Sequence, residues 1–255
     1  MNKYYQRNLI KEKLQDSILN FVYNSKKFNK LIFTGGTCLR KLYNLPRLSE
    51  DLDFDFTSNN FKIDDFKIEI EKYLVSKEKL NNIELKVANN KRTIFIKFLQ
   101  KNGEKIFVRC DFSKANKNVK TEINPYNSDR YNFFILNYDL PTLFGNKIKA
   151  FLERDFFKGS EQTMSFKGRD VFDIAWFIQL SAKSGFDLKP EWKNLEKDLK
   201  MTKKVIIQKV IGKVSKIKNE ELLLDLVPFI ESEKSISEFI GSFVSVIKNK
   251  LKFIL

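Results

Sequence analysis

The chain has 255 residues, of which 42% are hydrophobic and 31% charged, and it contains only nine glycines and five prolines. That length and composition are typical of a globular protein with one or two domains, and they exclude collagen-like, low-complexity and disordered chains. The 47 basic residues exceed the 32 acidic ones, and the resulting formal net charge of +15 favours a polyanionic partner such as nucleic acid or a nucleotide.

Missing residue types narrow the possible chemistry further. The sequence has no histidine, which excludes Ser-His-Asp and Cys-His nucleophile systems, histidine general bases and His-ligated zinc sites. The two cysteines, Cys38 and Cys110, are not part of a Cys-x-x-Cys pair, so neither a structural zinc cluster nor a disulfide framework is indicated. Catalysis would therefore depend on carboxylates, lysines, arginines, hydroxyls and bound metal ions, of which Mg²⁺ prefers oxygen ligands.

The sequence also bears on where the protein acts. No apolar run reaches the roughly 18 residues of a membrane-spanning helix. The N-terminal MNKYYQRNLIKEK is too charged for a signal peptide. We therefore expect a cytoplasmic protein without a membrane partner.

Helices and short strands alternate in the first part of the chain. Apolar residues recur at helical spacing over 3–26, which predicts a helix there. A buried strand, a second helix, a loop and a strictly alternating strand are then expected over 31–35, 37–44, 45–50 and 51–56. A third helix and three β-rich runs follow over 61–80, 83–88, 93–99 and 105–112. The Asn-Gly pair in QKNGEK predicts a hairpin between the last two runs.

The character of the sequence changes near residue 140. Pro141 suits the first turn of a helix, and the residues after it are rich in helix formers. Helices are expected over 141–155, 169–182, 191–217 and 219–253. We therefore predict an α/β protein of the α+β type, in which a domain over 1–140 has a mixed sheet flanked by helices. A helical bundle over 141–255 is expected to contribute to the active-site cleft.

Three carboxylates stand out in the alternating segment DLDFDF. On a strand, Asp51, Asp53 and Asp55 project from one face at spacings of about 6.5–7 Å, while the apolar residues between them anchor the other face in the core. Rigid neighbouring carboxylates can hold a pair of divalent cations, which stabilise the attacking and leaving oxygens in phosphoryl or nucleotidyl transfer. A solvated edge strand with acidic residues is the plainer alternative.

A glycine pair ends the short strand before this segment. At Gly35 and Gly36 the missing side chains allow the backbone N–H groups of a helix N-terminus to approach a triphosphate. Thr37 could add a hydroxyl or cap the helix. An ordinary strand-to-helix turn would also explain the pair. Its combination with a D-x-D strand about 14 residues later favours metal-dependent transfer of a nucleotide.

The segment GGTCLRKLYNLPRLSEDLDFDF resembles the signature of the polymerase-β-like nucleotidyltransferase superfamily, in which a strand, Gly-Gly-Ser/Thr, a helix and D-h-D follow one another (h, apolar). Its fuller form is similar to the AbiEii/AbiGii-type toxin branch, with approximately GGTxLR, a short loop and R-x-S-x-D-L-D-F. That branch has a later lysine at the start of a helix and an Arg-Asp pair in the next helix. GNKIKAFLER at 145–154 and KGRDVFDI at 167–174 fit these. The resemblance covers about 31–180, whereas 1–30 and 185–255 match no family by their motifs.

The resemblance implies a nucleotidyltransferase-like fold for the first domain and roles for individual residues. Gly35, Gly36 and Thr37 would hold the triphosphate of the nucleotide. Asp51 and Asp53 would bind Mg²⁺.

Four further residues are candidates for the same site. By the resemblance, Lys147 would contact the nucleotide phosphates and Asp170 would complete the site; a solvated lysine, with Lys149 as a rival, and a helix-surface ion pair or cap are the alternatives. Asp111 would act as a general base or extra ligand, or else cap a turn at the end of its strand. Arg40 would pair with phosphates, although a structural ion pair is an equal alternative.

We therefore predict a Mg²⁺-dependent nucleotidyltransferase in which a hydroxyl attacks the α-phosphate of an NTP and pyrophosphate leaves. The resemblance implies the toxin of a bacterial toxin–antitoxin or phage-defence pair, with a cognate antitoxin as partner and RNA, at the tRNA 3′ end, as acceptor. The alternatives are an enzyme of the same fold acting on a small molecule or protein, and a catalytically degenerate module that binds RNA or a partner. The positive charge favours RNA over a cationic drug, although only eight of the 47 cations are arginines, so compositional drift toward lysine also explains it.

Overall fold

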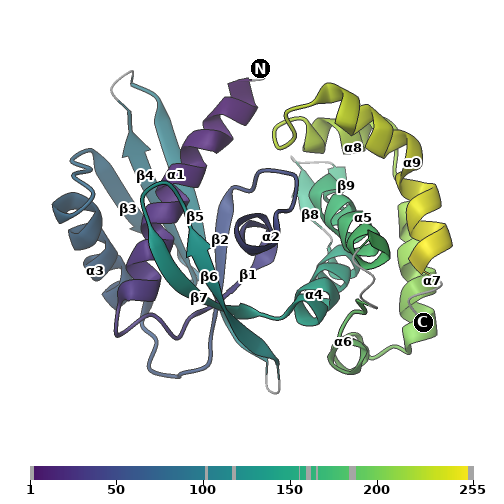
Figure 1. The fold of residues 1–255 in the computed structure, drawn as a ribbon, viewed down its shortest axis with the longest axis horizontal. Coiled ribbons are helices and arrows are strands. Elements are labelled where there is room, and N and C mark those ends of the chain that lie inside the picture. Colours follow the sequence, from purple (N-terminus) through teal and green to yellow (C-terminus); the bar gives the residue numbers. More distant parts are fainter. Residues whose placement is uncertain are drawn as a thin grey trace. The chain divides into compact units, whose positions relative to one another are not determined.

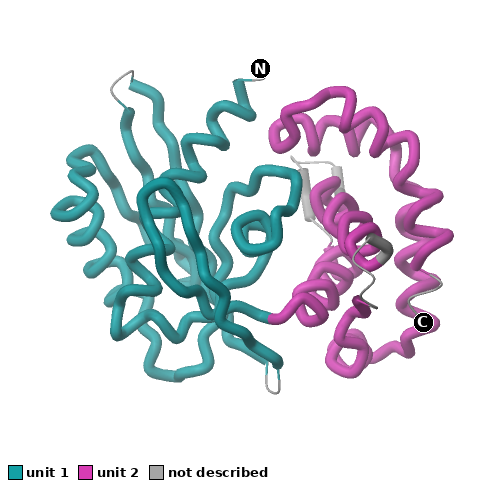
Figure 2. The backbone as a smooth tube through the Cα atoms, viewed as in Figure 1, with its two compact units in different colours: residues 1, 3–138 teal, residues 2, 139–255 magenta. Residues whose placement is uncertain are grey.

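The computed structural model describes residues 3–100, 103–116, 119–154, 156–158, 162–164, 166–183 and 188–251. The chain divides into two compact units, Lys3–Tyr138 and Asp139–Leu255, which Figure 2 colours teal and magenta. Each unit has its own elements and its own core.

A seven-stranded mixed sheet forms the first unit, with the strand order β3-β4-β5-β2-β1-β7-β6. Its strands are β1 (Ile32–Thr34), β2 (Asp51–Phe56), β3 (Ile83–Val87), β4 (Thr93–Leu99), β5 (Lys105–Lys114), β6 (Thr121–Asn127) and β7 (Asn132–Tyr138). β2 pairs antiparallel with β1 and parallel with β5. The DLDFDF segment is therefore the central strand of the sheet.

Three helices belong to the first unit: α1 (Lys3–Asn24), α2 (Gly35–Tyr43) and α3 (Ile63–Ser76). α1 runs across the strands in the view of Figure 1 and packs against β5 and β7. α2 begins directly after β1 and ends at Asn44, which takes the left-handed conformation with φ 58°. Because asparagine visits this conformation more readily than most residues, the sequence itself favours ending the helix there.

An aromatic core covers one face of the sheet. Phe54 of β2 stacks on Phe112 of β5 with ring centroids 5.7 Å apart, and Phe66 of α3 meets Phe112 edge-on at 4.9 Å. Phe21 of α1 lies 5.6 Å from Phe66. Such pairs add to the free energy gained by burying the rings. Because side chains alternate along a strand, the carboxylates of DLDFDF lie on the face opposite this core.

A buried carboxylate joins the end of α3 to the turn between β6 and β7. Glu78, whose side chain is 5% exposed, accepts a hydrogen bond from the Tyr73 hydroxyl at 2.7 Å and pairs with the Arg130 guanidinium at 2.9 Å. Burial alone would raise the pKa of Glu78, but hydrogen bonds from Tyr131 and Tyr73 and the charge of Arg130 outweigh burial and lower this pKa below 4.5. The ionised form of Glu78 therefore stabilises the first unit.

The second unit is mainly helical. Its helices are α4 (Leu140–Glu153), α5 (Gly168–Lys183), α6 (Trp192–Leu199), α7 (Lys203–Val214), α8 (Asn219–Leu226) and α9 (Glu233–Leu251). A small hairpin pairs β8 (Phe156–Lys158) with β9 (Gln162–Met164). Asp139 caps α4 by accepting a hydrogen bond from the Thr142 backbone at 3.0 Å, and Pro141 lies in the first turn. Phe144 of α4 stacks on Phe177 of α5 at 4.5 Å, which ties the two helices together.

The predicted fold class, a mixed sheet with flanking helices followed by a helical bundle, is confirmed. The helical character predicted over 191–217 and 219–253 is confirmed, and each range contains two helices. Lys200 takes a left-handed conformation that ends α6, and Pro228 follows α8 and cannot continue a helix. Strands β6 to β9 are additions to the expected elements.

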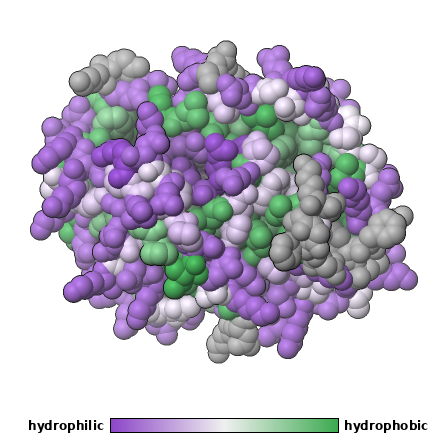
Figure 3. All heavy atoms as spheres, viewed as in Figure 1, coloured by the Kyte–Doolittle hydropathy of each residue, from purple (hydrophilic) through white to green (hydrophobic). Residues whose placement is uncertain are grey.

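Hydrophilic side chains dominate the face shown in Figure 3, with apolar side chains scattered among them. Cys38 and Cys110 are both fully buried, and burial, together with the negative charge of Asp111, raises the pKa of the Cys110 thiol. Along the described ranges, none of the helices has the length and apolar character needed to cross a membrane.

Candidate active site

Strand pairing brings carboxylates from two strands together. In the register of β2 with β5, Asp53 lies beside Asp111 and Asp51 beside Arg109. In the register of β1 with β2, Thr34 lies beside Asp53. Because neighbouring strands are about 4.8 Å apart, Thr34, Asp53 and Asp111 form a row across three adjacent strands. This row lies on the face opposite the aromatic core.

The glycine bend after β1 approaches this row closely. Gly35 has φ +81°, a conformation that favours glycine. A Cβ built on Gly35 would lie 2.0 Å from Oδ2 of Asp53 and 2.8 Å from its Cγ. The Asp53 carboxylate therefore points toward Gly35, the first residue of α2. A residue with a side chain at position 35 would collide with this carboxylate.

Gly36 lies against two side chains of the loop before β2. A Cβ at this position would lie 2.7 Å from Nη2 of Arg47 and 3.1 Å from Oγ of Ser49. Arg47 is buried and donates a hydrogen bond to the Leu48 carbonyl at 2.8 Å. The second glycine thus lets the loop before β2 pack directly under the first turn of α2.

Thr37 also binds α2 to β2. The side chain is fully buried, and its hydroxyl donates a hydrogen bond to the backbone carbonyl of Asp51. The N-cap of α2 is Thr34, so the alternative that Thr37 caps the helix is wrong. By holding the backbone of Asp51, the Thr37 hydroxyl positions the first of the two predicted metal ligands.

Asp111 is held from two sides. Its Oδ1 accepts a hydrogen bond from the Thr93 hydroxyl at 2.6 Å, and its Oδ2 pairs with Nε of Arg109 at 2.7 Å. Burial would lower the pKa of Arg109, but pairing with Asp111 and the charges of Asp51 and Asp53 outweigh burial and raise it. Arg109 is therefore a cation that partly balances three neighbouring carboxylates.

Sequence reasoning missed Arg109 and Thr93 as parts of this site. The alternation in KIFVRCDF could have placed Arg109 on the same face as Asp111. Thr93 reaches Asp111 only through the pairing of β4 with β5, which no local pattern reveals. Since β5 continues to Lys114, the alternative that Asp111 caps a turn at the end of its strand is wrong.

Two other predicted or neighbouring residues have partners within the first unit. Asp55, which continues the acidic face, accepts a hydrogen bond from the Tyr138 hydroxyl at 2.7 Å. Burial raises the pKa of Asp55 despite this bond. Arg40 pairs with Glu12 of α1 at 3.0 Å, in keeping with the structural alternative. The side chains of Arg40 and Glu12 are 32% and 16% exposed. A phosphate role for Arg40 stays a prediction.

The predicted lysine lies in the second unit. Lys147 of α4 pairs with Asp173 of α5 at 2.8 Å, and Asp173 is fully buried. The rival Lys149 pairs with Asp198 of α6 at 2.9 Å. The two lysines thus differ in setting, since Lys147 is 13% exposed and Lys149 31% exposed.

Asp170, the second predicted residue of this unit, lies in the first turn of α5. Its Oδ2 is 2.7 Å from Nε of Arg154, at the end of α4. Its sequence neighbour Arg169 instead lies near Asp225 of α8, with Nε and Oδ2 3.8 Å apart. The predicted Arg-Asp pair is therefore divided between two partners, and the roles of Lys147 and Asp170 toward a nucleotide stay predictions.

Comparison with known proteins identifies the arrangement. The family described as "Nucleotidyl transferase AbiEii toxin, Type IV TA system" matches residues 18–245. The chain belongs to the AbiEii nucleotidyl transferase toxin family. The resemblance drawn from GGTCLR and DLDFDF is thus confirmed, and the protein is a nucleotidyltransferase. No curated protein matches it.

Two crystal structures share the fold of this AbiEii family member. One is JHP933 from Helicobacter pylori, with a TM-score of 0.54 and 17% sequence identity, covering 97% of this chain and 94% of that one. The other is a Helicobacter pylori protein provisionally assigned as a nucleotidyltransferase, with a TM-score of 0.51 and 19% identity, covering 100% and 99%. Likeness at these identities concerns the fold alone.

We call Asp51 and Asp53 of β2 and Asp111 of β5 the acidic row. The donor chemistry of this row fits a magnesium ion. Mg²⁺ in nucleotide sites takes one or two carboxylates, with waters and substrate phosphates completing its octahedron. Asp51 and Asp53 offer two such carboxylates from alternate positions of one strand. Within the described part of the chain, no group of three or more His, Cys, Asp or Glu side chains is arranged to hold a metal. This two-carboxylate set would take its other ligands from nucleotide and water.

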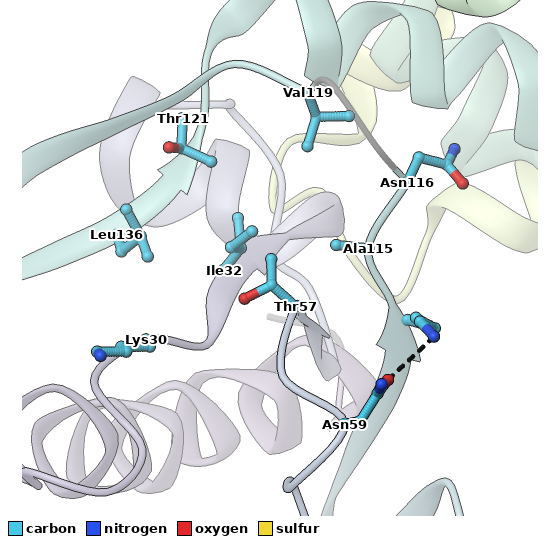
Figure 4. Close-up of a pocket in the computed structure, with 10 residues that line it drawn as sticks. Lys30, Ile32, Thr57, Asn59, Ala115, Asn116, Val119, Thr121 and Leu136 are labelled. Carbon is cyan, nitrogen blue, oxygen red and sulfur yellow. Dashed lines mark hydrogen bonds between the residues drawn. The ribbon is translucent and has the colours of Figure 1, made fainter.

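A separate pocket of about 810 Å³ opens at the other end of β1 and β2 (Figure 4). Ile32 and Leu136 line it, together with Lys114, which donates a hydrogen bond to Asn59 at 3.0 Å. Among its described lining residues, the carboxylates of the acidic row are not found. The lining of this pocket is thus distinct from the glycine bend and its neighbouring aspartates.

Proposed function

We propose that this AbiEii family member transfers the NMP part of an NTP to a hydroxyl of RNA, with the tRNA 3′ end as acceptor and Mg²⁺ as cofactor. It would act in the cytoplasm as the toxin of a toxin–antitoxin or phage-defence pair. One observation carries the proposal: the row of Thr34, Asp53 and Asp111 lies directly beside the Gly35 bend. Family membership supports the nucleotidyl transfer itself.

The triphosphate would lie at the glycine bend. The N-terminus of α2 offers backbone N–H groups and the positive end of a helix dipole, which attract anionic oxygens. Gly35 and Gly36 add no side chain of their own at this end of the helix. Thr37 would contribute its backbone N–H, because its hydroxyl is donated to a carbonyl of β2. Asp51 and Asp53 would hold Mg²⁺, which when bound neutralises charge on the triphosphate and on the leaving pyrophosphate.

Asp111 is the candidate general base. Thr93 and Arg109 fix its carboxylate beside Asp53, so its orientation does not depend on the substrate. An acceptor hydroxyl within hydrogen-bond reach would give its proton to Asp111 as the oxygen bonds to the α-phosphorus. The bond between the α-phosphorus and the bridging oxygen of pyrophosphate would break in the same transfer.

Other parts of the proposal rest on family resemblance and charge. Lys147 would contact nucleotide phosphates and Asp170 would complete the site. Through these two residues the helical domain would contribute to the active-site cleft, as predicted from the sequence. The type IV toxin–antitoxin family implies an antitoxin partner. The formal charge of +15 supports RNA over a cationic aminoglycoside as acceptor.

Nucleotide incorporation tests the proposal directly. Each labelled NTP in turn is incubated with the protein and total tRNA, with total protein or an aminoglycoside in parallel reactions. We expect label in tRNA in the presence of Mg²⁺ and none after chelation or in Asp53→Asn. Asp64→Asn is the matched control, because it removes the same charge at an exposed position of α3 and should incorporate normally.

The outcomes separate the parts of the proposal. Full incorporation by Asp53→Asn would overturn the metal site. Label in protein or drug instead of tRNA would overturn the RNA acceptor while keeping the enzyme class. Binding of NTP and Mg²⁺ without turnover on any acceptor would favour a degenerate binding module.

A further inference from the structure

Strand pairing also produces an array of rings and cations on the sheet face that carries the carboxylates. In the register of β4 with β5, Phe95 lies beside Arg109 and Lys97 lies beside Phe107. The two rings are diagonal neighbours, with centroids 6.4 Å apart and planes at 65°. We call these four residues the strand platform. Aromatic and basic side chains alternate along each strand, as Phe95 and Lys97 or Phe107 and Arg109, and the pairing of β4 with β5 places each ring beside a cation of the other strand.

Three of the four side chains of the strand platform are partly open to solvent, and the fourth, Phe95, has intermediate burial. Phe107 is 41% exposed, and the side chains of Lys97 and Arg109 are 40% and 45% exposed. Nζ of Lys11, from α1, lies 5.0 Å from the centroid of the Phe107 ring, a distance at which a cation attracts an aromatic face. Phe107 thus belongs to an accessible face of the sheet, whereas the aromatic core occupies the opposite face.

The same register continues from the strand platform into the acidic row. Arg109 lies beside Asp51 of β2 and pairs with Asp111 of its own strand. Phe95 is separated from Asp51 by two strand spacings, or about 10 Å. A flexible polymer lying across β4 and β5 would therefore reach the carboxylates with its end.

We propose that the strand platform binds the single-stranded end of the RNA acceptor and leads its terminal hydroxyl to Asp111. Aromatic rings stack on bases whatever their sequence, and neighbouring lysines and arginines bind the phosphates between them. A duplex keeps its bases stacked inside and cannot use the rings in this way. The inference deepens the proposed function and rests on it, because it takes RNA to be the acceptor.

Acidic neighbours do not prevent this binding. Lys97 pairs with Glu84 of β3 at 3.1 Å, and the two side chains are 40% and 65% exposed. Such a pair is worth little in water, so a phosphate can replace the carboxylate at small cost. Arg109 contacts Asp111 through Nε, and a guanidinium has five N–H donors in all.

Direct binding to RNA tests the platform without catalysis. A short oligoribonucleotide of mixed sequence, labelled at its 5′ end, is titrated with the full chain at several salt concentrations, without NTP and with EDTA. Phe107→Ala removes the ring, Phe107→Tyr keeps an aromatic face, and Lys97→Ala removes one charge. Phe134→Ala is the matched control, because that ring of β7 is 66% exposed and lies outside the platform.

We expect Phe107→Ala to raise the Kd about tenfold, since stacking on an aromatic side chain accounts for a loss of that size on truncation. The slope of log affinity against log salt should stay unchanged in this variant, whereas Lys97→Ala should reduce its magnitude by about 0.7, the value for one phosphate of a single strand. Phe107→Tyr and Phe134→Ala should bind like the wild type. Unchanged affinity in Phe107→Ala, or an equal loss in Phe134→Ala, would overturn the platform.

Turnover kinetics then separate the platform from the proposed function. The platform predicts that Phe107→Ala raises the KM for RNA and leaves the KM for NTP unchanged. If the wild type labels RNA and Phe107→Ala keeps the wild-type KM for RNA, the platform is refuted and the proposed function stands. If the wild type labels only protein or a drug, the RNA acceptor is refuted first and the platform with it.

Discussion

Replacing Gly35 with alanine would test the contact between the glycine bend and Asp53 of the acidic row. The new Cβ would lie 2.0 Å from Oδ2 of Asp53, whereas ordinary contact begins at 3.4 Å, so the carboxylate must retreat by about 1.4 Å. A misplacement of about 1 Å in a catalytic arrangement can cost about 100-fold in rate. We therefore expect nucleotide incorporation by Gly35→Ala to fall by about 100-fold or more.

Gly103→Ala is the matched control for this experiment. Gly103 has the same φ of +81°, but nothing lies within 4 Å of a Cβ built on it. Left-handed strain should cost both variants about 1–2 kcal/mol of unfolding free energy, measured by urea denaturation. Incorporation by Gly103→Ala should match the wild type. If Gly35→Ala also keeps wild-type incorporation, the proposed placement of the metal and triphosphate beside this bend is wrong.

Three further predictions follow from the ion pairs. Because its pKa is lowered, Glu78 stabilises the fold above about pH 4.5 and loses this contribution as the pH falls through its folded-state pKa. Glu78→Gln should therefore unfold at a lower urea concentration than the wild type at pH 7, and the difference between the two midpoints should close in acid. A difference that does not change with pH would contradict the role of the Glu78 charge beside Arg130. Asp111→Asn should lower kcat by about 100- to 10,000-fold with little change in the KM for NTP, as loss of a general base predicts, and an unchanged kcat would exclude that role. Lys147→Ala removes the ion-pair partner of the fully buried Asp173 and should cost about 3–5 kcal/mol in urea unfolding followed by tryptophan fluorescence. Asp173→Asn in the same chain should partly restore this loss, and a loss below about 1 kcal/mol would show that the pair is not structural.

Local patterns were sufficient for the central strand. Strict alternation determines which side chains share a face, so the common side of Asp51 and Asp53 could be predicted without any knowledge of the sheet. Pro141 likewise marks the first turn of α4 because a proline there loses no hydrogen bond. These features depend on residues within a few positions of each other.

Contacts between distant strands could not be predicted in this way. Asp111 meets Asp53 because β2 pairs in parallel with β5, with α3, β3 and β4 lying between them in sequence. β6 contains Pro125, which argues against a strand unless the strand lies at an edge, and β6 is the last strand of the sheet. Strand order is a property of the whole unit, so the local sequence does not contain it.

Helical spacing left a different ambiguity in the second unit. Residues three apart share one face of a helix, so sequence cannot tell whether Lys147 faces Asp170 or Asp173. The Arg-Asp motif singled out Asp170, whereas the structure pairs Lys147 with Asp173 and gives Asp170 to Arg154. The packing of α4 on α5 decides between the two aspartates.

The deep burial of Cys38 and Cys110 makes the wild-type chain almost inert to thiol-directed reagents in its native state. A single cysteine introduced at the surface would then be the fast-reacting thiol, and no background residue need be removed first. Leu99, which is 39% exposed at the end of β4, suits this purpose. A maleimide dye on Leu99→Cys would report in real time when an oligonucleotide arrives on that side of the sheet.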